Sequence, residues 1–355
     1  MNPTQLLELL VGVPSVSGNE TALADLLVRT LSGDGFQVYR EGDSIWFTLG
    51  HAARPHLLLL SHLDTVPPSK GWIGDPFQLR ADGDKLIGLG ANDAKGSVAA
   101  MILAARALRD EQLGGAVTFA FVEEEERSGD GIRAIKPKLA EIDAAIVGEP
   151  TGLEVCTAQR GMLILRCIAH GEAAHVAHAH FGRNAIHKAA RDIARLATMS
   201  FEPHDLLGTT APQVVEITGG EARNQIPDRC EFFVDLRTTP NLDHKAMAAR
   251  IDAVLESEVA VHSDRYYPVA TNGSEMVVRA ALEAADASAG VGSVTTSDWA
   301  FLKGIPAVKI GPGDTRRSHR PNEYMRVAEL EAGVAFYRQC VRTYFQMAAA
   351  EVAHV

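Results

Sequence analysis

Histidines and carboxylates follow most of the apolar segments that could form buried strands. In chain order the set comprises His62, Asp64, Asp93, Glu123–Glu126, Glu149, Asp314 and His319. Because function collects at the carboxyl ends of strands in open α/β sheets, we expect these side chains to converge. Imidazoles and carboxylates without a competing thiol suit zinc, cobalt or manganese, and several carboxylates suit two ions that share one bridging ligand.

Each of these residues also has a plain structural explanation when it is taken alone. His62 could be a hydrogen-bonded core histidine, Asp93 a turn former, Glu149 a strand end, and the glutamate run a solvated face. The coincidence of ligand types after successive strands favours the metal site. The stretch GLGANDAKGS lacks the spacing of a phosphate-binding loop and of a dinucleotide site.

The elements that must position these residues alternate between strands and helices. Near-continuous apolar runs predict strands at 56–64, 116–125 and 144–150, with a helix over 95–110 between the first two. Later elements are a helix at 274–289, a strand in IPAVKIGPG (305–313) and a helix at 328–348. Strands of this kind predict an α/β domain whose sheet is covered on both faces.

The middle of the chain has a different order of elements, which indicates an inserted domain. We expect strands at 161–171, 213–220, 230–237 and 259–262, with helices at 184–199 and 243–258. This β-α-β-β-α-β order is the ferredoxin-like plan. The sequence therefore predicts a discontinuous α/β domain, residues 1–160 and 269–355, interrupted by an α+β domain at 161–268.

Composition excludes several classes of partner. A length of 355 residues suggests two domains, and a net charge of −11 argues against a nucleic-acid or acidic-membrane partner. No apolar run approaches the roughly 20 residues of a membrane span, and the N-terminus does not resemble a signal peptide. The four scattered cysteines are typical of free thiols in a reducing environment, so we expect a cytoplasmic protein.

Taken together, the motifs resemble those of the M20 family of dinuclear zinc amidohydrolases. They are SHLDTVPP, GLGANDAKGSVAAM, EEEERSGDGI, AIVGEPTG, GEAAHVAHAHFGRNAI, RNQIPD and TTSDWAFLKGIPAVKIGPGDTRRSHRPNEY, in the family's order and over nearly the whole chain. The nearest resemblance is to acetylornithine deacetylases, LysK-type hydrolases and succinyl-diaminopimelate desuccinylases. It implies a zinc-binding catalytic domain with a mixed sheet flanked by helices, and an inserted lid domain through which the protein forms a homodimer.

The resemblance also implies roles for individual residues around two divalent ions, with zinc favoured over cobalt or manganese. His62 and Glu149 would hold one ion, and Asp93 would bridge it to a second ion held by His319. Asp64 would orient the imidazole of His62, a contact that raises ligand basicity.

The family's glutamate motif has a general base followed by a ligand, and four consecutive glutamates leave its register ambiguous. Counting back from GDGIRAI, we assign the base to Glu124 and the ligand to Glu125, with a shift of one residue as the alternative. The base would take a proton from water and deliver it to the leaving amine.

The resemblance places four further residues at the substrate. His175 would support the oxyanion from the partner subunit, although the family's usual proline is replaced here by Ala179-His180. Asn224, Arg237 and Thr296 would contact the substrate carboxylate or carbonyl, and an arginine suits planar carboxylate recognition. The alternative for Arg237 is an ordinary salt bridge at a strand end.

The expected activity is hydrolysis of an N-acyl amino acid, with N-acetylornithine as the favoured substrate and arginine biosynthesis as the setting. Alternatives within the family are a LysK-type hydrolase, an acetylcitrulline or succinyl-amino-acid deacylase, and a dipeptidase. An alternative of another class is a binding protein that kept the fold without catalysis.

Overall fold

The computed structural model describes residues 1–51 and 54–353, which form two compact units. The first unit comprises residues 1–157, 271–291 and 297–355, and the second comprises 158–270 and 292–296. The sequence led us to expect one domain at 1–160 and 269–355 and an inserted domain at 161–268. Residues 292–296, which include Thr296, group with the second unit and not with the first as the sequence led us to expect.

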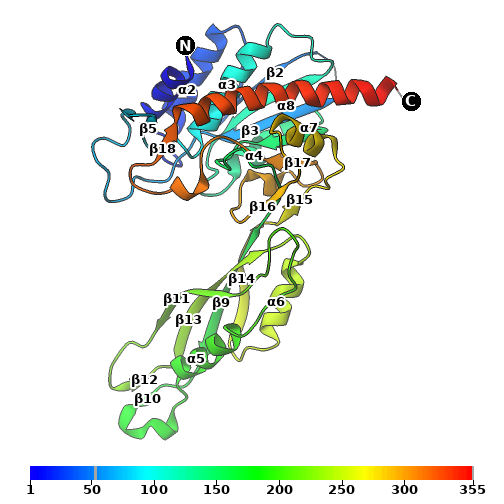
Figure 1. The fold of residues 1–355 in the computed structure, drawn as a ribbon. Helices are drawn as coiled ribbons and strands as arrows, with labels where there is room; N and C mark the ends of the chain where they lie inside the picture. The colour runs from blue at the N-terminus through cyan, green and yellow to red at the C-terminus, as the bar shows by residue number, and fades with distance from the viewer. Residues whose placement is uncertain (52–53, 354–355) are drawn as a thin grey trace. The chain divides into compact units, whose positions relative to one another are not determined.

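A mixed sheet forms the centre of the first unit (Figure 1). Its strands, in spatial order, are β1 (Tyr39–Glu41), β2 (Ser44–Leu49), β6 (Ala116–Val122), β3 (His56–His62), β7 (Ala144–Val147), β17 (Ala307–Lys309) and β8 (Cys156–Gln159). Two short strands, β15 (Val269–Ala270) and β16 (Val291–Ser293), also pair with β8. The four strands from β6 to β17 run parallel, and β1, β2 and β8 pair antiparallel with their neighbours. β3 and β6 are buried along their whole length, as strands covered on both faces require.

Helices pack on this sheet and fill its core. They are α1 (Pro3–Val11), α2 (Thr21–Gly33), α3 (Lys95–Leu108), α4 (Asp130–Ile135), α7 (Met276–Ala284) and α8 (Val327–Ala353). α1 begins at a capping box, in which Asn2 and Gln5 each accept a hydrogen bond from the other's backbone N–H. α3 is buried on nearly every side because it packs against α1, α8 and the sheet.

The second unit has the expected ferredoxin-like topology. Strands β9 (Gly161–His170), β11 (Gln213–Gly219), β13 (Arg229–Thr238) and β14 (Glu258–Tyr266) form an antiparallel sheet in the order β11-β13-β9-β14. Helices α5 (Ala185–Leu196) and α6 (His244–Asp252) complete the alternation. Every second residue of β9 and β13 is buried, which gives the sheet one apolar face.

The predicted fold class is confirmed, and the differences concern the ends of elements. The strands expected to run to residues 125 and 150 end at Val122 and Val147, because the chain turns before the ligand residues. α6 ends at Asp252, and the residues beyond it supply a longer β14 than expected. A small sheet of β4 (Arg80–Asp82), β5 (Lys85–Ile87) and β18 (Tyr324–Arg326) was not expected.

Among residues 1–51 and 54–353, no helix combines the length and the apolar character that a membrane span requires.

Candidate metal centre

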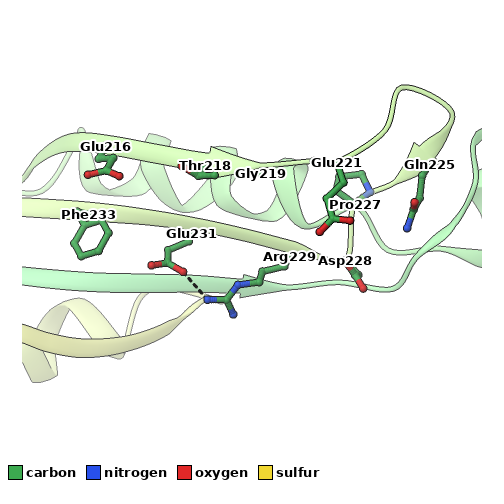
Figure 2. Close-up of a pocket in the computed structure, with 11 residues that line it drawn as sticks. Glu216, Thr218, Gly219, Glu221, Gln225, Pro227, Asp228, Arg229, Glu231 and Phe233 are labelled. Atoms are coloured by element: carbon green, nitrogen blue, oxygen red, sulfur yellow. Dashed lines mark hydrogen bonds and ion pairs between the residues drawn. The ribbon is translucent and has the colours of Figure 1, made fainter.

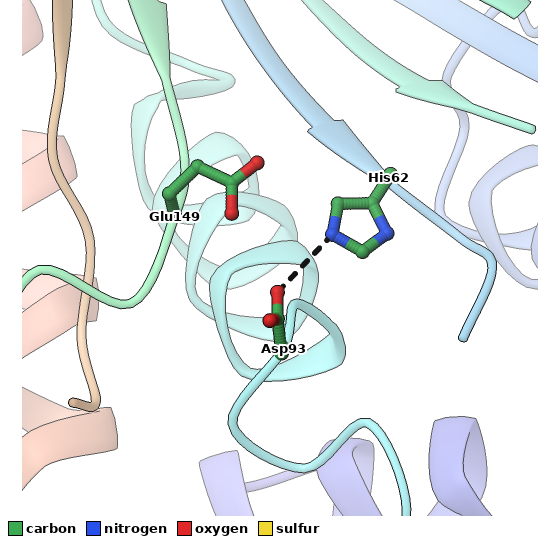
Figure 3. A group of neighbouring side chains, drawn as sticks. All are labelled: His62, Asp93 and Glu149. Atoms are coloured by element: carbon green, nitrogen blue, oxygen red, sulfur yellow. Dashed lines mark hydrogen bonds and ion pairs between the residues drawn. The ribbon is translucent and has the colours of Figure 1, made fainter. Parts of the chain in front are cut away.

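The first group of potential ligands lies where two parallel strands end. His62 is the last residue of β3, and Glu149 lies two residues beyond β7. Because Leu60 pairs with Val147 in the parallel ladder, His62 and Glu149 stand level with each other. Asp93, from the loop before α3, completes the group (Figure 3). The ligand atoms of the three residues all lie within 4.8 Å of one another.

The second group consists of Asp93, Glu126 and His319, whose ligand atoms also lie within 4.8 Å of one another. Glu126 follows β6, and His319 lies in the segment between β17 and β18. His319 Nε2 lies 2.8 Å from Oε1 of Glu126 and 3.7 Å from Oδ2 of Asp93.

Asp93 belongs to both groups and presents a different oxygen to each. Its Oδ1 lies 3.3 Å from Nε2 of His62, and its Oδ2 faces His319. A carboxylate that offers one oxygen to each of two imidazole-containing groups has the geometry of a bridging ligand.

Asp64 contacts the ring nitrogen of His62 that faces away from Asp93. Its Oδ1 lies 3.3 Å from Nδ1 of His62, and that nitrogen lies 3.0 Å from the backbone oxygen of Asp64, so Nε2 is directed at Asp93. The Asp64 carboxylate also accepts a hydrogen bond from Oγ of Ser17 at 2.7 Å. Burial alone would raise the pKa of Asp64, but these hydrogen bonds and the charge of His62 hold that pKa below its ordinary value.

Buried carboxylates also fix the turn made by the glutamate run. The Glu124 N–H donates to Oε1 of Glu20 at 3.2 Å, and the N–H groups of Glu125 and Glu126 donate to the two oxygens of Asp64 at 3.0 and 3.1 Å. Glu124 takes a positive φ of 54°, in the left-handed region, just after β6 ends. The Asp64 carboxylate therefore orients both His62 and the residues that follow β6.

The side chains of the glutamate run have different surroundings. Glu123 accepts from the Asp43 N–H at 2.9 Å, and Glu124 accepts from Oγ of Ser128 at 2.9 Å. Burial and the charge of Glu149 raise the pKa of Glu125 well above its ordinary value.

The register differs from the one expected from the sequence. The expected ligand Glu125 is not in the group with Asp93 and His319, and Glu126 takes that place. The expected base Glu124 is engaged with Ser128, and Nη1 of Arg127 lies 3.7 Å from its carboxylate. The glutamate that lies with Asp93 and His319 thus stands one residue further along the chain than the expected ligand.

The electrostatics of the groups suit divalent cations. Burial raises the pKa of Glu149 to about 8, and burial also raises the pKa of Glu126. The hydrogen bond to Glu126 raises the pKa of His319 to about 9. Clustered carboxylates that resist ionisation are stabilised by nearby positive charge. A donor set of two imidazoles and three carboxylates fits zinc, cobalt or manganese.

The remaining predicted site residues lie in the second unit. His175 belongs to β10 (Ala174–His175), is exposed, and accepts a hydrogen bond from the Ala177 N–H at 3.1 Å. Asn224 lies close to it, because the N–H of Val176 donates to the Asn224 backbone oxygen at 2.9 Å. Arg237 is half exposed, and its Nε donates to Asp235 at 3.1 Å.

Three buried charged residues near the ligand groups were not singled out from the sequence. Both carboxylate oxygens of Asp298 are buried without a hydrogen-bond partner, and burial raises its pKa to about 8. Lys309 is buried, and burial lowers its pKa although the charge of Glu149 opposes the shift. Glu323 accepts hydrogen bonds from the loop that carries Asp93. A lysine inside the apolar strand PAVKIG was a signal that could have been noticed.

The second unit contains a hollow of about 330 Å³ (Figure 2). Its lining consists of Glu216, Thr218, Gly219, Gly220, Glu221, Gln225, Pro227, Asp228, Arg229, Glu231 and Phe233. Arg229 forms an ion pair with Glu231, as Figure 2 shows. None of the residues predicted to act in catalysis or metal binding lines this hollow.

Comparisons with known proteins show what this chain is similar to. The model of a protein family described as "Peptidase family M20/M25/M40" matches residues 58–343. A succinyl-diaminopimelate desuccinylase of Xanthomonas campestris pv. campestris (strain B100) is 32% identical over an aligned length of 363 residues. The alignment covers 94% of this chain and 96% of that protein.

Two solved structures share the fold. A tripeptidase from Staphylococcus aureus subsp. aureus Mu50 superposes with a TM-score of 0.81 at 21% identity, covering 97% of this chain and 98% of the other. A dinuclear metal-binding M20 peptidase from Bacillus subtilis gives a TM-score of 0.76 at 17% identity, covering 97% and 98%.

Proposed function

The chain belongs to peptidase family M20/M25/M40, and from that premise we propose that it removes the acyl group from an N-acyl amino acid. Family membership makes it a hydrolase of amide bonds. The observation that carries the proposal is Asp93, which offers one carboxylate oxygen to each of two ligand groups. This arrangement supports hydrolysis with two divalent ions over simple storage of one metal.

Membership of the family does not specify which acyl group is removed, so the substrate is proposed from the similarity to a relative. The desuccinylase relative supports a dicarboxylic acyl group, so an N-succinyl amino acid is the first substrate that we assign. N-acetylornithine, the substrate that we favoured from the sequence, is the second, and neither the motifs nor the similarity single it out. An amino acid that carries either acyl group presents one amide bond to be hydrolysed, and a succinyl group adds a free carboxylate to those of the amino acid.

The residues of the two groups fit a pair of ions. His62, Glu149 and Asp93 would hold one ion, and Asp93, Glu126 and His319 would hold the other. When bound, such ions lower the pKa of water and polarise an amide carbonyl. Asp64 keeps Nε2 of His62 directed at the centre, since it lies at the opposite ring nitrogen.

Glu125 is the residue to which we assign the general base. Burial and Glu149 raise its pKa, and a base works best when its pKa approaches the working pH. It would take a proton from the attacking water and deliver it to the departing amine. Glu126 replaces Glu125 as the ligand, and Glu124 keeps no role in the reaction.

The second unit would supply substrate contacts and the assembly. We assign His175 to the oxyanion, and Arg237, Asn224 and Thr296 to the substrate carboxylate or carbonyl. Exposed apolar side chains on β11 and after His175 are consistent with a homodimer formed through this unit. They are Val176, Phe181, Val215 and Ile217.

Assaying metal-loaded protein against N-acyl amino acids tests the proposal. The panel holds N-succinyl and N-acetyl forms of diaminopimelate, ornithine, citrulline and lysine, with dipeptides as the comparison class. We expect the largest kcat/KM on one N-acyl amino acid and its loss after chelation. Turnover of dipeptides alone would move the assignment to a peptidase, and no turnover with zinc, cobalt or manganese would refute it.

A further inference from the structure

The loop that carries the bridging carboxylate is held by a residue outside both ligand groups. Oε1 of Glu323 accepts hydrogen bonds from the backbone N–H groups of Asn92 and Asp93, both at 2.9 Å. One side-chain oxygen thus satisfies two consecutive amides of the loop before α3.

Glu323 is itself held in place by the backbone around it. It is 2% exposed, and it immediately precedes β18, which pairs with β5 at the start of the same loop. The Gly88 N–H donates to the backbone oxygen of Glu323 at 3.0 Å. The clamp therefore has main-chain and side-chain parts, and both act on residues 88–93.

The segment that carries Glu323 also carries His319, so one stretch of chain serves both sides of the second ligand group. Asn92 adds a second tie to this segment. Its Nδ2 donates to the Asp314 backbone oxygen at 3.0 Å and to Oγ of Ser318 at 3.2 Å, and its Oδ1 accepts from the Asp314 N–H at 2.8 Å. The position of Asp93 relative to His319 follows from these bonds.

We propose that Glu323 is a positioning residue that sets where the Asp93 carboxylate stands between the two metal groups. The inference rests on the proposed function, because it matters only if Asp93 bridges two ions. Without the Glu323 acceptor, the buried amides of Asn92 and Asp93 lose their partner, and the loop must move to satisfy them. A displaced bridging oxygen weakens the hold on both ions, as losses of outer contacts do at other metal sites.

Three variants at this position separate positioning from bulk stability. Glu323→Ala removes the acceptor, Glu323→Asp withdraws it by one methylene, and Glu323→Gln retains one acceptor oxygen. We expect the affinity for the more weakly bound ion to fall about 10- to 100-fold in Glu323→Ala. Glu323→Gln should stay within about threefold of wild type, since it can keep the shared hydrogen bonds. Zinc binding is measured by competition with a chromophoric chelator.

Asp192 provides a matched control because it is also a buried carboxylate that accepts hydrogen bonds from two consecutive backbone N–H groups. This buried carboxylate accepts from the backbone N–H groups of Glu256 and Ser257 in the second unit, at 3.0 and 2.8 Å. Asp192→Ala should lower the melting temperature and leave zinc affinity unchanged. Glu323→Ala should lower zinc affinity and kcat with little change in KM, and should speed hydrogen exchange at residues 88–95.

The outcomes distinguish the two proposals. Wild-type protein that binds fewer than two ions and hydrolyses no acyl amino acid would remove the proposed function. Wild-type protein with two ions, together with a folded Glu323→Ala variant of unchanged zinc affinity and kcat, would overturn the role of Glu323. If Glu323→Ala does not fold, Glu323→Asp decides: unchanged affinity and exchange in that variant contradict the inference.

Discussion

Replacing the two central glutamates one at a time gives the most informative test of the active-site assignment. Glu125→Gln keeps the size of the side chain and removes its ability to take a proton. Glu124→Gln makes the same change one residue earlier, in a side chain that accepts from Ser128 at 2.9 Å. The pair differs in position by one residue and is identical in chemistry, so each variant is the other's control.

The expected effects differ by orders of magnitude. A general base contributes about 10²- to 10⁴-fold, so Glu125→Gln should lower kcat by that factor, or about 3–5.5 kcal/mol of barrier. In Glu124→Gln the amide oxygen can still accept from Ser128. The contact to Arg127 at 3.7 Å is partly exposed and worth below about 1 kcal/mol. We expect kcat/KM of Glu124→Gln to stay within about threefold of wild type.

The assay follows release of the free amine from the best N-acyl amino acid, with metal content measured on the same samples. Both variants should hold as many ions as the wild type. An inactive Glu124→Gln beside an active Glu125→Gln would restore the register expected from the sequence. Loss of an ion from Glu125→Gln would show that Glu125 is a ligand and not the base.

Three further predictions concern other parts of the chain. Arg237→Ala should raise KM for an acyl amino acid about 10- to 100-fold with little change in kcat, as steady-state kinetics would show, because a charge-assisted contact to the substrate carboxylate would be lost. Gly131→Ala should destabilise the fold by about 1–3 kcal/mol in denaturant titrations, since its Cβ would lie 2.3 Å from the Glu123 backbone oxygen. Burial would raise the pKa of Asp192, but its hydrogen bonds hold that pKa below the ordinary 3.8. The ionised Asp192 therefore stabilises the fold fully above pH 3.8, and this stabilisation is lost as the pH falls through the pKa of the folded protein. Asp192→Asn should flatten the acid side of the stability curve measured by circular dichroism.

The sequence predicted the architecture because its signals are local. Runs such as HLLLL and AVTFAFV mark buried strands wherever they occur, and the period-2 pattern of the second unit marks strands with one apolar face. The same reasoning brought His62, Asp93, Glu149 and His319 to one edge of the sheet, where the structure places them in the two ligand groups.

The register of the glutamates could not be predicted because it depends on contacts made far along the chain. The turn at Glu124 is fixed by Glu20 and Asp64, which lie 104 and about 60 residues away. Four identical residues give no internal mark of where the turn falls. The clamp by Glu323 is similarly non-local, since it joins positions 230 residues apart.

We propose that two ions bound at Asp93 make this chain a deacylase. The most direct test of this proposal is zinc titration of chelator-stripped protein, with turnover of an N-succinyl or N-acetyl amino acid measured at each step. We expect binding of two ions per chain, activity that appears with them, and loss of both in Asp93→Ala. Full activity in Asp93→Ala, or in protein stripped of metal, would contradict it.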